Sequence, residues 1–329
     1  MTLGSAQRRV RPGRTIHGIS AVLLPFDEHG SIAWEAFERL LERTAAAGLD
    51  VAVNMDTGFG DLLAPPERAA VLDATRSVLG GDRTFYAGAY PDPEASDPLP
   101  GYRDSVAAIA ARGATPVIVQ SRVMHAMDDA DKAALYRAIA TLAGQAVAFE
   151  LGPVFAPHGE IWSDEFFARI LDIPEIVGAK HSSLERSTEL RRLAARDDAR
   201  PEFRVYTGND LAIDMIAFGS DYLLGLSTFT PTGFARRDAA FAADDVAFLE
   251  RNDALQHLGN VGFRTPVPAY KHAAAMYLHL TGVLESDHIH PRAAHRLAAD
   301  RVLLFDCALR LGEIDDPERI FRQRVARFL

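Results

Sequence analysis

The chain has 329 residues, of which 48% are hydrophobic and 24% are charged, and its formal net charge is −10 at pH 7. These values are typical of a soluble globular protein with a large core, and the negative charge argues against binding to nucleic acid or to anionic membrane surfaces. The length fits either one large α/β barrel with an added region or two ordinary domains.

The N-terminal segment, residues 1–15, is rich in arginine but has no apolar run after its basic residues. We therefore expect a flexible arm and not a signal peptide. No apolar stretch of the sequence reaches the ~18 residues of a membrane span. The single cysteine, Cys307, lies in an apolar run, where we expect it to pack as a small hydrophobic residue, and it can form no internal disulfide. We expect a cytoplasmic protein.

After the arm, short apolar runs alternate with amphipathic stretches. The runs are brief and often rich in β-branched residues, as expected of buried parallel strands. We predict strands at 19–24, 51–55, 85–90, 117–120, 147–151, 176–180, 203–207 and 222–226. We predict helices at 34–47, 66–78, 102–112, 129–143, 164–171, 184–195 and 211–218, with Ser163 and Asp210 as N-caps.

Eight strands that alternate with helices predict a (β/α)₈ TIM barrel. The alternative is an open, doubly wound sheet, but the sequence contains neither a G-x-G-x-x-G motif nor a P-loop. Helical patterns continue after the eighth strand, notably at 268–281 and 291–311. We therefore expect the barrel to occupy residues 16–245 and a C-terminal helical region to occupy residues 246–329.

Active sites of TIM barrels lie at the carboxyl ends of the strands, and the predicted strand 176–180 ends in a lysine, Lys180. Burial in a barrel mouth lowers the pKa of a lysine and frees its amine as a nucleophile toward carbonyl groups. Arginine stays protonated and cannot do this. Only three of the 35 basic residues are lysines, so a lysine here is conspicuous. The alternative is a structural lysine that pairs with Glu150 or Asp56.

Several segments, in order, resemble the dihydrodipicolinate synthase / N-acetylneuraminate lyase family of class I aldolases. The similarity extends over residues 18–282. The segment 177–183, Val-Gly-Ala-Lys-His-Ser-Ser, resembles the strand that carries the family's Schiff-base lysine. The segment 56–63 occupies the place of the family's Gly-Thr-Thr-Gly-Glu loop. Further resemblance lies in residues 21–32, 208–210, 219–221 and 265–271.

The resemblance implies that Lys180 forms a Schiff base with pyruvate or a related 2-keto acid. The iminium then acts as an electron sink for making or breaking a carbon–carbon bond, or for dehydration. The resemblance also implies a homodimer or homotetramer that needs no metal and no organic cofactor. Asp56, Thr57 and the backbone near Leu224 and Gly225 would hold the keto acid.

The departures from the family concern the residues around the lysine. The family's tyrosine at the end of strand five appears as Glu150, which could serve as general acid and base. The family's tyrosine pair after strand four becomes Arg122 and Val123, and Arg122 could either bind a substrate carboxylate or form a surface ion pair. These changes argue against dihydrodipicolinate synthesis itself and favour a different, less charged second substrate.

Two alternatives to this lyase stay open. One is a barrel that binds carbonyl ligands without turnover, in which Lys180 only pairs with Glu150. The other is a lyase in which Glu150 acts as a base without an imine. The histidines at 272, 279, 288 and 290 lack a third ligand at convincing spacing, so we expect no metal site.

Overall fold

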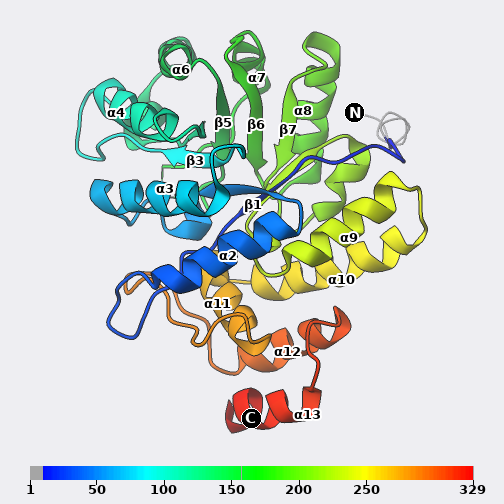
Figure 1. Cartoon of the computed structure of the whole chain (residues 1–329). Helices are drawn as coiled ribbons and strands as arrows, with labels where there is room; N and C mark the ends of the chain where they lie inside the picture. Colours follow the sequence, from blue (N-terminus) through cyan, green and yellow to red (C-terminus); the bar gives the residue numbers. More distant parts are fainter. Residues whose placement is uncertain (1–9, 157, 329) are drawn as a thin grey trace.

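The computed structural model describes residues 10–156 and 158–328. Eight parallel strands close into a barrel in the order β1 to β8, which confirms the predicted TIM barrel and rules out the open sheet (Figure 1). The strands are β1 (Gly18–Ala21), β2 (Asp50–Val53), β3 (Tyr86–Ala89), β4 (Thr115–Ile118), β5 (Ala146–Leu151), β6 (Ile176–Ser182), β7 (Arg204–Thr207) and β8 (Asp221–Leu224).

Helices surround the barrel and connect successive strands (Figure 1). They are α2 (Trp34–Ala46), α3 (Pro65–Leu79), α4 (Leu99–Ala110), α5 (Arg122–Ala126), α6 (Asp129–Ala143), α7 (Asp164–Leu171), α8 (Arg186–Ala199) and α9 (Pro231–Ala242). Short 3₁₀ turns are η1 (Asp56–Gly58), η2 (Ile213–Phe218) and η3 (Leu226–Thr228). The segment predicted as a helix at 211–218 is thus mostly the 3₁₀ turn η2.

The strands divide their side chains between two cores, because successive residues of a strand point to opposite faces. The inner core fills the barrel and includes Val117, Phe149 and Leu223. The outer core lies between strands and helices and includes Leu224, the next residue of β8. This alternation determines which residues of each strand reach the mouth of the barrel.

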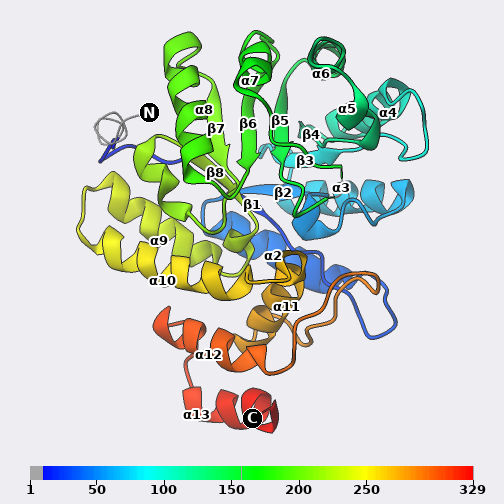
Figure 2. The ribbon, with the colours of Figure 1, turned by 180° about the vertical axis from the view of Figure 1, so that it is seen from behind.

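The C-terminal helices are α10 (Ala247–Gly262), α11 (Tyr270–Leu280), α12 (Asp300–Arg310) and α13 (Pro317–Ile320). The predicted helix at 268–281 is α11, whereas the one predicted at 291–311 begins only at Asp300. Seen from behind, α11 and α12 lie next to α10, at the side of the barrel that carries α2 (Figure 2). Cys307 is 1% exposed in α12, as predicted for a packed thiol. None of the described helices combines the length and apolar character needed to cross a bilayer.

The N-terminal arm was predicted over residues 1–15, and its first nine residues lie outside the described part of the chain. The backbone N–H of Arg11 donates to the carbonyl of Ala217 at 2.8 Å. The Arg14 guanidinium forms an ion pair with Asp221 at 2.8 Å. The described residues of the arm therefore contact the strand β8 and the turn η2.

Candidate active site

Lys180 lies near the carboxyl end of β6 and is only 7% exposed. Its Nζ lies 4.4 Å from the centre of the Phe149 ring. The other two lysines form ion pairs, Lys132 with Glu160 at 2.5 Å and Lys271 with Asp56 at 2.8 Å. Within residues 10–156 and 158–328, no carboxylate oxygen lies within 4.0 Å of the Lys180 nitrogen, so its charge has no direct partner.

Burial lowers the pKa of Lys180 from 10.5 to about 8, although the charges of Asp210 and Asp56 act in the opposite direction. A lysine with this pKa has a substantial neutral fraction close to neutral pH, whereas an exposed lysine has almost none. The neutral amine is the nucleophilic form. Lys180 is therefore a buried amine with a lowered pKa, and its role as a nucleophile stays a prediction.

The register between β5 and β6 shows which residues face Lys180. Phe149 pairs with Lys180 and Glu150 pairs with His181 across the two strands. Because alternate residues point to opposite faces, Phe149 faces the barrel interior beside Lys180. Glu150 and His181 point outward, toward the helices.

Glu150 is fully buried in that outer layer. Its Oε2 lies 2.5 Å from His181 Nδ1, and its Oε1 accepts hydrogen bonds from Arg192 at 2.8 Å and from the Trp162 N–H at 2.9 Å. Burial alone would raise the pKa of Glu150, but His181 and Arg192 hold it below its ordinary value. The predictions that Glu150 relays protons in the mouth, or pairs with Lys180, are therefore wrong in their geometry. The residue of β5 that faces the barrel mouth beside Lys180 is Phe149, one position before Glu150.

Asp56 and Thr57, predicted to hold the keto acid, meet the start of α11. The Tyr270 hydroxyl donates to Asp56 Oδ2 at 2.7 Å, and Thr57 Oγ1 lies 2.8 Å from the same hydroxyl. Lys271 Nζ donates to Asp56 Oδ1 at 2.8 Å. The Asp56 charge is thus compensated within the protein, which reduces its repulsion of an anionic substrate.

Gly225 and Leu224 follow β8 in different ways. A Cβ at Gly225 would come within 2.9 Å of the Tyr270 ring and 3.0 Å of Thr57 Oγ1, so glycine permits the close approach of both residues. Leu224 packs its side chain into the outer core, and its carbonyl accepts a hydrogen bond from Ser227. Gly225 therefore borders the predicted keto-acid site, whereas the Leu224 side chain does not reach it.

Asp210 is a member of this site that the sequence did not single out. We predicted it as the N-cap of a helix, but η2 begins at Ile213, and the Asp210 carboxylate accepts the N–H of Leu226 at 2.7 Å. Burial raises its pKa to about 7, and its charge acts on Lys180. A carboxyl group with this pKa can both donate and accept a proton at neutral pH.

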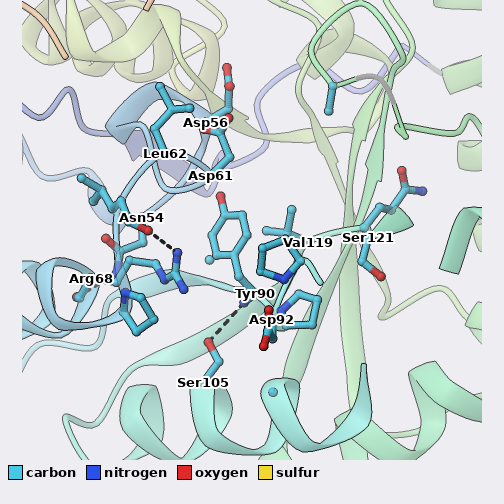
Figure 3. Close-up of a pocket in the computed structure, with 18 of the residues that line it drawn as sticks. Asn54, Asp56, Asp61, Leu62, Arg68, Tyr90, Asp92, Ser105, Val119 and Ser121 are labelled. Carbon is cyan, nitrogen blue, oxygen red and sulfur yellow. Dashed lines mark hydrogen bonds between the residues drawn. The ribbon is translucent and has the colours of Figure 1, made fainter. Parts of the chain in front are cut away.

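A cavity of about 1000 Å³ opens from the mouth toward α3 and α4 (Figure 3). Phe149 and Asp56 line its inner part. Arg122 lines it too, is exposed, and forms no ion pair with any described residue. The surface ion pair that we considered for Arg122 is therefore absent from the part of the chain that the structure describes. Its guanidinium is available to a ligand.

No group of three or more His, Cys, Asp or Glu residues within the described ranges is arranged to hold a metal ion.

Comparisons with known proteins agree with this architecture. The chain belongs to the DUF993 family of proteins of unknown function, whose model matches residues 17–329. It is 25% identical over 264 residues to a 4-hydroxy-tetrahydrodipicolinate synthase of Shewanella pealeana, covering 76% of this chain and 84% of the relative. The predicted resemblance to the dihydrodipicolinate synthase family is thereby confirmed, with this chain as a divergent member.

Solved structures show the same fold. Dihydrodipicolinate synthase of Thermotoga maritima superimposes with a TM-score of 0.79 at 19% identity, covering 92% of this chain and 100% of that one. A prophage protein of the dihydrodipicolinic acid synthase family from E. coli K12 was solved in complex with pyruvate. It gives a TM-score of 0.79 at 16% identity, and the match covers 90% of this chain and 98% of that protein. The dihydrodipicolinate synthase of Acinetobacter baumannii, also complexed with pyruvate, gives a TM-score of 0.77 at 20% identity. The match covers 92% of this chain and 100% of that one.

The sequence singled out Lys180, Asp56, Thr57 and Gly225, which lie near the carboxyl ends of β6, β2 and β8, and their roles stay predictions. It did not single out Asp210, whose charge acts on Lys180, or Tyr270 and Lys271, which contact Asp56. For Lys271 a signal existed, because it is one of only three lysines in an arginine-rich chain. Tyr270 and Lys271 come from a helix far along the chain, and their contact with Asp56 has no local pattern that would reveal it.

Proposed function

We propose that this protein is a lyase of the class I aldolase type, which forms an imine between Lys180 and pyruvate or a related 2-keto acid. The observation that carries the proposal is the buried Lys180 amine, which has no ion-pair partner among the described residues and a pKa of about 8. A buried cation without a partner costs stability, so such a lysine is typical of a functional site. The pyruvate complexes of structural relatives support the choice of substrate.

The chemistry follows from the neutral amine. Lys180 Nζ attacks the keto carbon, the oxygen takes up two protons, one from the amine and one from an acid, and leaves as water, and an iminium results. Loss of a proton from the adjacent carbon gives an enamine, with the iminium as electron sink. The enamine carbon can then attack an electrophile, and the reverse sequence cleaves the bond. Water finally hydrolyses the iminium and restores the amine. The protein needs no metal or organic cofactor for these steps.

Asp210 is the group that we assign to proton transfer. It is buried, and its pKa is about 7, so both of its protonation states are available near neutral pH. It also interacts electrostatically with Lys180. Phe149, which faces the amine from β5, has no acidic proton and cannot transfer one.

The keto-acid carboxylate belongs beside Thr57 and Gly225, near the carboxyl ends of β2 and β8. Lys271 and Tyr270 neutralise Asp56 there. Gly225 lets Thr57 and the Tyr270 ring lie close to its backbone. Arg122 and Asp56 line the neighbouring cavity, where Arg122 adds positive charge that attracts an anionic substrate.

A borohydride trap tests the imine. The protein is incubated with pyruvate and sodium borohydride, digested, and mapped by mass spectrometry. Because the chain has three lysines, each can be scored separately. We expect the reduced adduct on Lys180 and none on Lys132, whose ammonium is paired with Glu160. Lys180→Met should lose the adduct, and Lys132→Arg should keep it.

Absence of an adduct on Lys180 with pyruvate and a panel of 2-keto acids would overturn the imine. Full activity of Lys180→Ala would instead point to a lyase that works without one. Binding of keto acids without any turnover would favour a binding protein.

We further propose a homodimer or homotetramer, which multi-angle light scattering of the purified protein would test.

A further inference from the structure

A second cluster of side chains suited to chemistry lies on the outer side of β6. Glu150 of β5 and His181 of β6 are buried there, and Ser183 follows the last residue of β6. Because side chains alternate along a strand, His181 points to the opposite face from Lys180. The imine chemistry proposed for Lys180 uses none of these three groups.

The three side chains form a continuous line of hydrogen bonds. His181 Nδ1 lies 2.5 Å from Glu150 Oε2, and His181 Nε2 lies 2.6 Å from Ser183 Oγ. A neutral imidazole in this position carries its proton on Nδ1, toward the carboxylate, and its Nε2 accepts the proton of the serine hydroxyl. The Glu185 carbonyl, at 3.2 Å, is the more distant acceptor for that proton. Nucleophile, base and orienting carboxylate are arranged in this way in serine hydrolases.

Glu150 is held in the charged form that this arrangement needs. Its Oε1 accepts hydrogen bonds from Arg192 at 2.8 Å and from the Trp162 N–H at 2.9 Å. Burial acts to raise the pKa of Glu150, but the interactions with His181 and Arg192 hold it below its ordinary value. A charged carboxylate at Nδ1 fixes the tautomer of the imidazole and stabilises the imidazolium that forms when Nε2 takes a proton.

The chain after Ser183 turns so that the start of α8 lies against the serine hydroxyl. Leu184 has a φ of 61°, in the left-handed region that residues with a Cβ seldom adopt. The Glu185 N–H donates to Ser183 Oγ at 3.1 Å. The first N–H groups of an α-helix have no partner within the helix, and the Glu185 side chain, at the N-cap of α8, accepts none of them. They can stabilise negative charge that develops beside Ser183.

Ser183 is accessible, in contrast to the two residues behind it. It is partly exposed, and Glu185 and Ser187 are exposed, whereas His181 is 1% and Glu150 0% exposed. The hydroxyl therefore lies at the surface of the carboxyl end of the barrel. Ser183 does not line the large cavity beside α3 and α4. A small carbonyl compound can thus reach the hydroxyl directly from solvent.

We propose that Ser183, His181 and Glu150 form a second catalytic site, which cleaves small acyl esters. The Ser183 oxygen attacks the ester carbonyl while its proton passes to His181 Nε2. The bond to the alcohol oxygen then breaks, this oxygen takes the proton from His181, and an acyl-serine remains. Water attacks the acyl group and gives a proton to His181. The carboxylic acid leaves as the proton returns to Ser183. Glu150 is a positioning residue that acts through His181, and no step involves Lys180.

A fluorophosphonate probe tests the nucleophile in the unmodified full-length protein. The probe reacts with serine hydroxyls that a base activates, and peptide mapping by mass spectrometry identifies the labelled residue. We expect the label on Ser183. We expect none on Ser187, which is exposed on the first turn of α8, because the His181 nitrogens contact Glu150 and Ser183 instead. An unlabelled Ser183 overturns the inference, whatever the variants show.

Hydrolysis of 4-nitrophenyl acetate measures turnover. Ser183→Ala should lower kcat/KM at least tenfold, and Ser187→Ala should change it less than twofold. Lys180→Met should also change it less than twofold, which excludes acetylation of the lysine amine as the source of the signal and separates this site from the imine. Thermal denaturation shows whether the variants are folded. If folded Ser183→Ala hydrolyses the ester at the parent rate, the inference fails. If it does not fold, the label mapped on the unmodified protein decides.

Glu150→Gln tests the positioning role. We expect the fluorophosphonate to label Ser183 at least tenfold more slowly in this variant and still to reach complete labelling. A purely structural role would instead reduce the final extent of labelling, because unfolded molecules do not react. Labelling at the parent rate would show that Glu150 has no part in the site and would overturn the proposed triad.

Discussion

The Nζ of Lys180 lies 4.4 Å from the centre of the Phe149 ring, on the neighbouring strand of the barrel. An aromatic ring attracts an ammonium group weakly, but it can neither neutralise the charge nor exchange a proton with it. Burial therefore lowers the pKa of the lysine, and proton transfer falls to a residue other than Phe149. This relationship underlies the first two predictions.

Imine formation should depend on pH through the amine. With a pKa of about 8, Lys180 is mostly protonated at pH 6 and mostly neutral at pH 9. We expect the rate of trapping by pyruvate and borohydride to rise about tenfold per pH unit below pH 8 and to level off above it. Single-turnover trapping between pH 6 and 9.5 measures this. A rate that keeps rising toward pH 10 would indicate an ordinary, solvated lysine.

Lys180→Met should stabilise the protein while it abolishes the adduct. The folded state holds the ammonium below its ordinary pKa, so below pH 8 the buried charge opposes folding. This penalty disappears as the pH rises from 8 to 10.5. Methionine is similar in length and apolar, and we expect the free energy of unfolding at pH 7 to increase by roughly 1–3 kcal/mol.

Urea denaturation at pH 7 and pH 10 checks the stability of Lys180→Met. The advantage of the variant should shrink at pH 10, where the lysine of the parent protein is neutral in the folded state. A variant that is less stable at pH 7 would show that the Lys180 ammonium has a stabilising partner.

The sequence predicted the fold well because strand and helix periodicities are local. The eight apolar runs mark the strands directly, and the closed barrel follows from their number and their alternation with helices. The position of Lys180 follows from the same pattern. The orientation of Glu150 does not, because a shift of one residue in the register of a strand exchanges its faces. Tyr270 reaches Thr57 across 213 residues of chain, a contact that depends on how α11 packs.

Glu150→Gln should destabilise the fold and have little direct effect on the imine. The substitution leaves Arg192 with a weakened partner in a buried pair at 2.8 Å, and disrupting such a pair costs about 3–5 kcal/mol. Glu165→Gln, at an exposed position of α7, should change stability by less than about 0.5 kcal/mol. Thermal denaturation measures both variants. Unaltered stability with lost turnover would restore the catalytic role predicted from the sequence.

Arg122→Gln should weaken binding of the keto acid without blocking chemistry. The guanidinium is exposed on the cavity wall and has no ion pair among the described residues, so a ligand carboxylate is its natural partner. We expect KM for pyruvate to rise about three- to tenfold and kcat to stay within twofold. The effect should shrink at high salt, because the site is open to solvent. An equal KM for variant and parent at low salt would argue against this contact.

Asp210→Asn should separate imine formation from the later proton transfer. Asparagine can still accept the Leu226 N–H that positions residue 210, but it cannot exchange a proton at neutral pH. In D₂O the enamine of bound pyruvate exchanges its methyl protons, and this exchange is visible by proton NMR. We expect Asp210→Asn to slow the exchange about 10²–10⁴-fold while borohydride still traps the adduct on Lys180. Asp214 on η2 forms an ion pair with Arg186 of α8 that is open to solvent. Asp214→Asn should leave the exchange unaltered. Normal exchange in Asp210→Asn would place the proton relay elsewhere, with the Tyr270 hydroxyl, bound to both Asp56 and Thr57, as the next group to test.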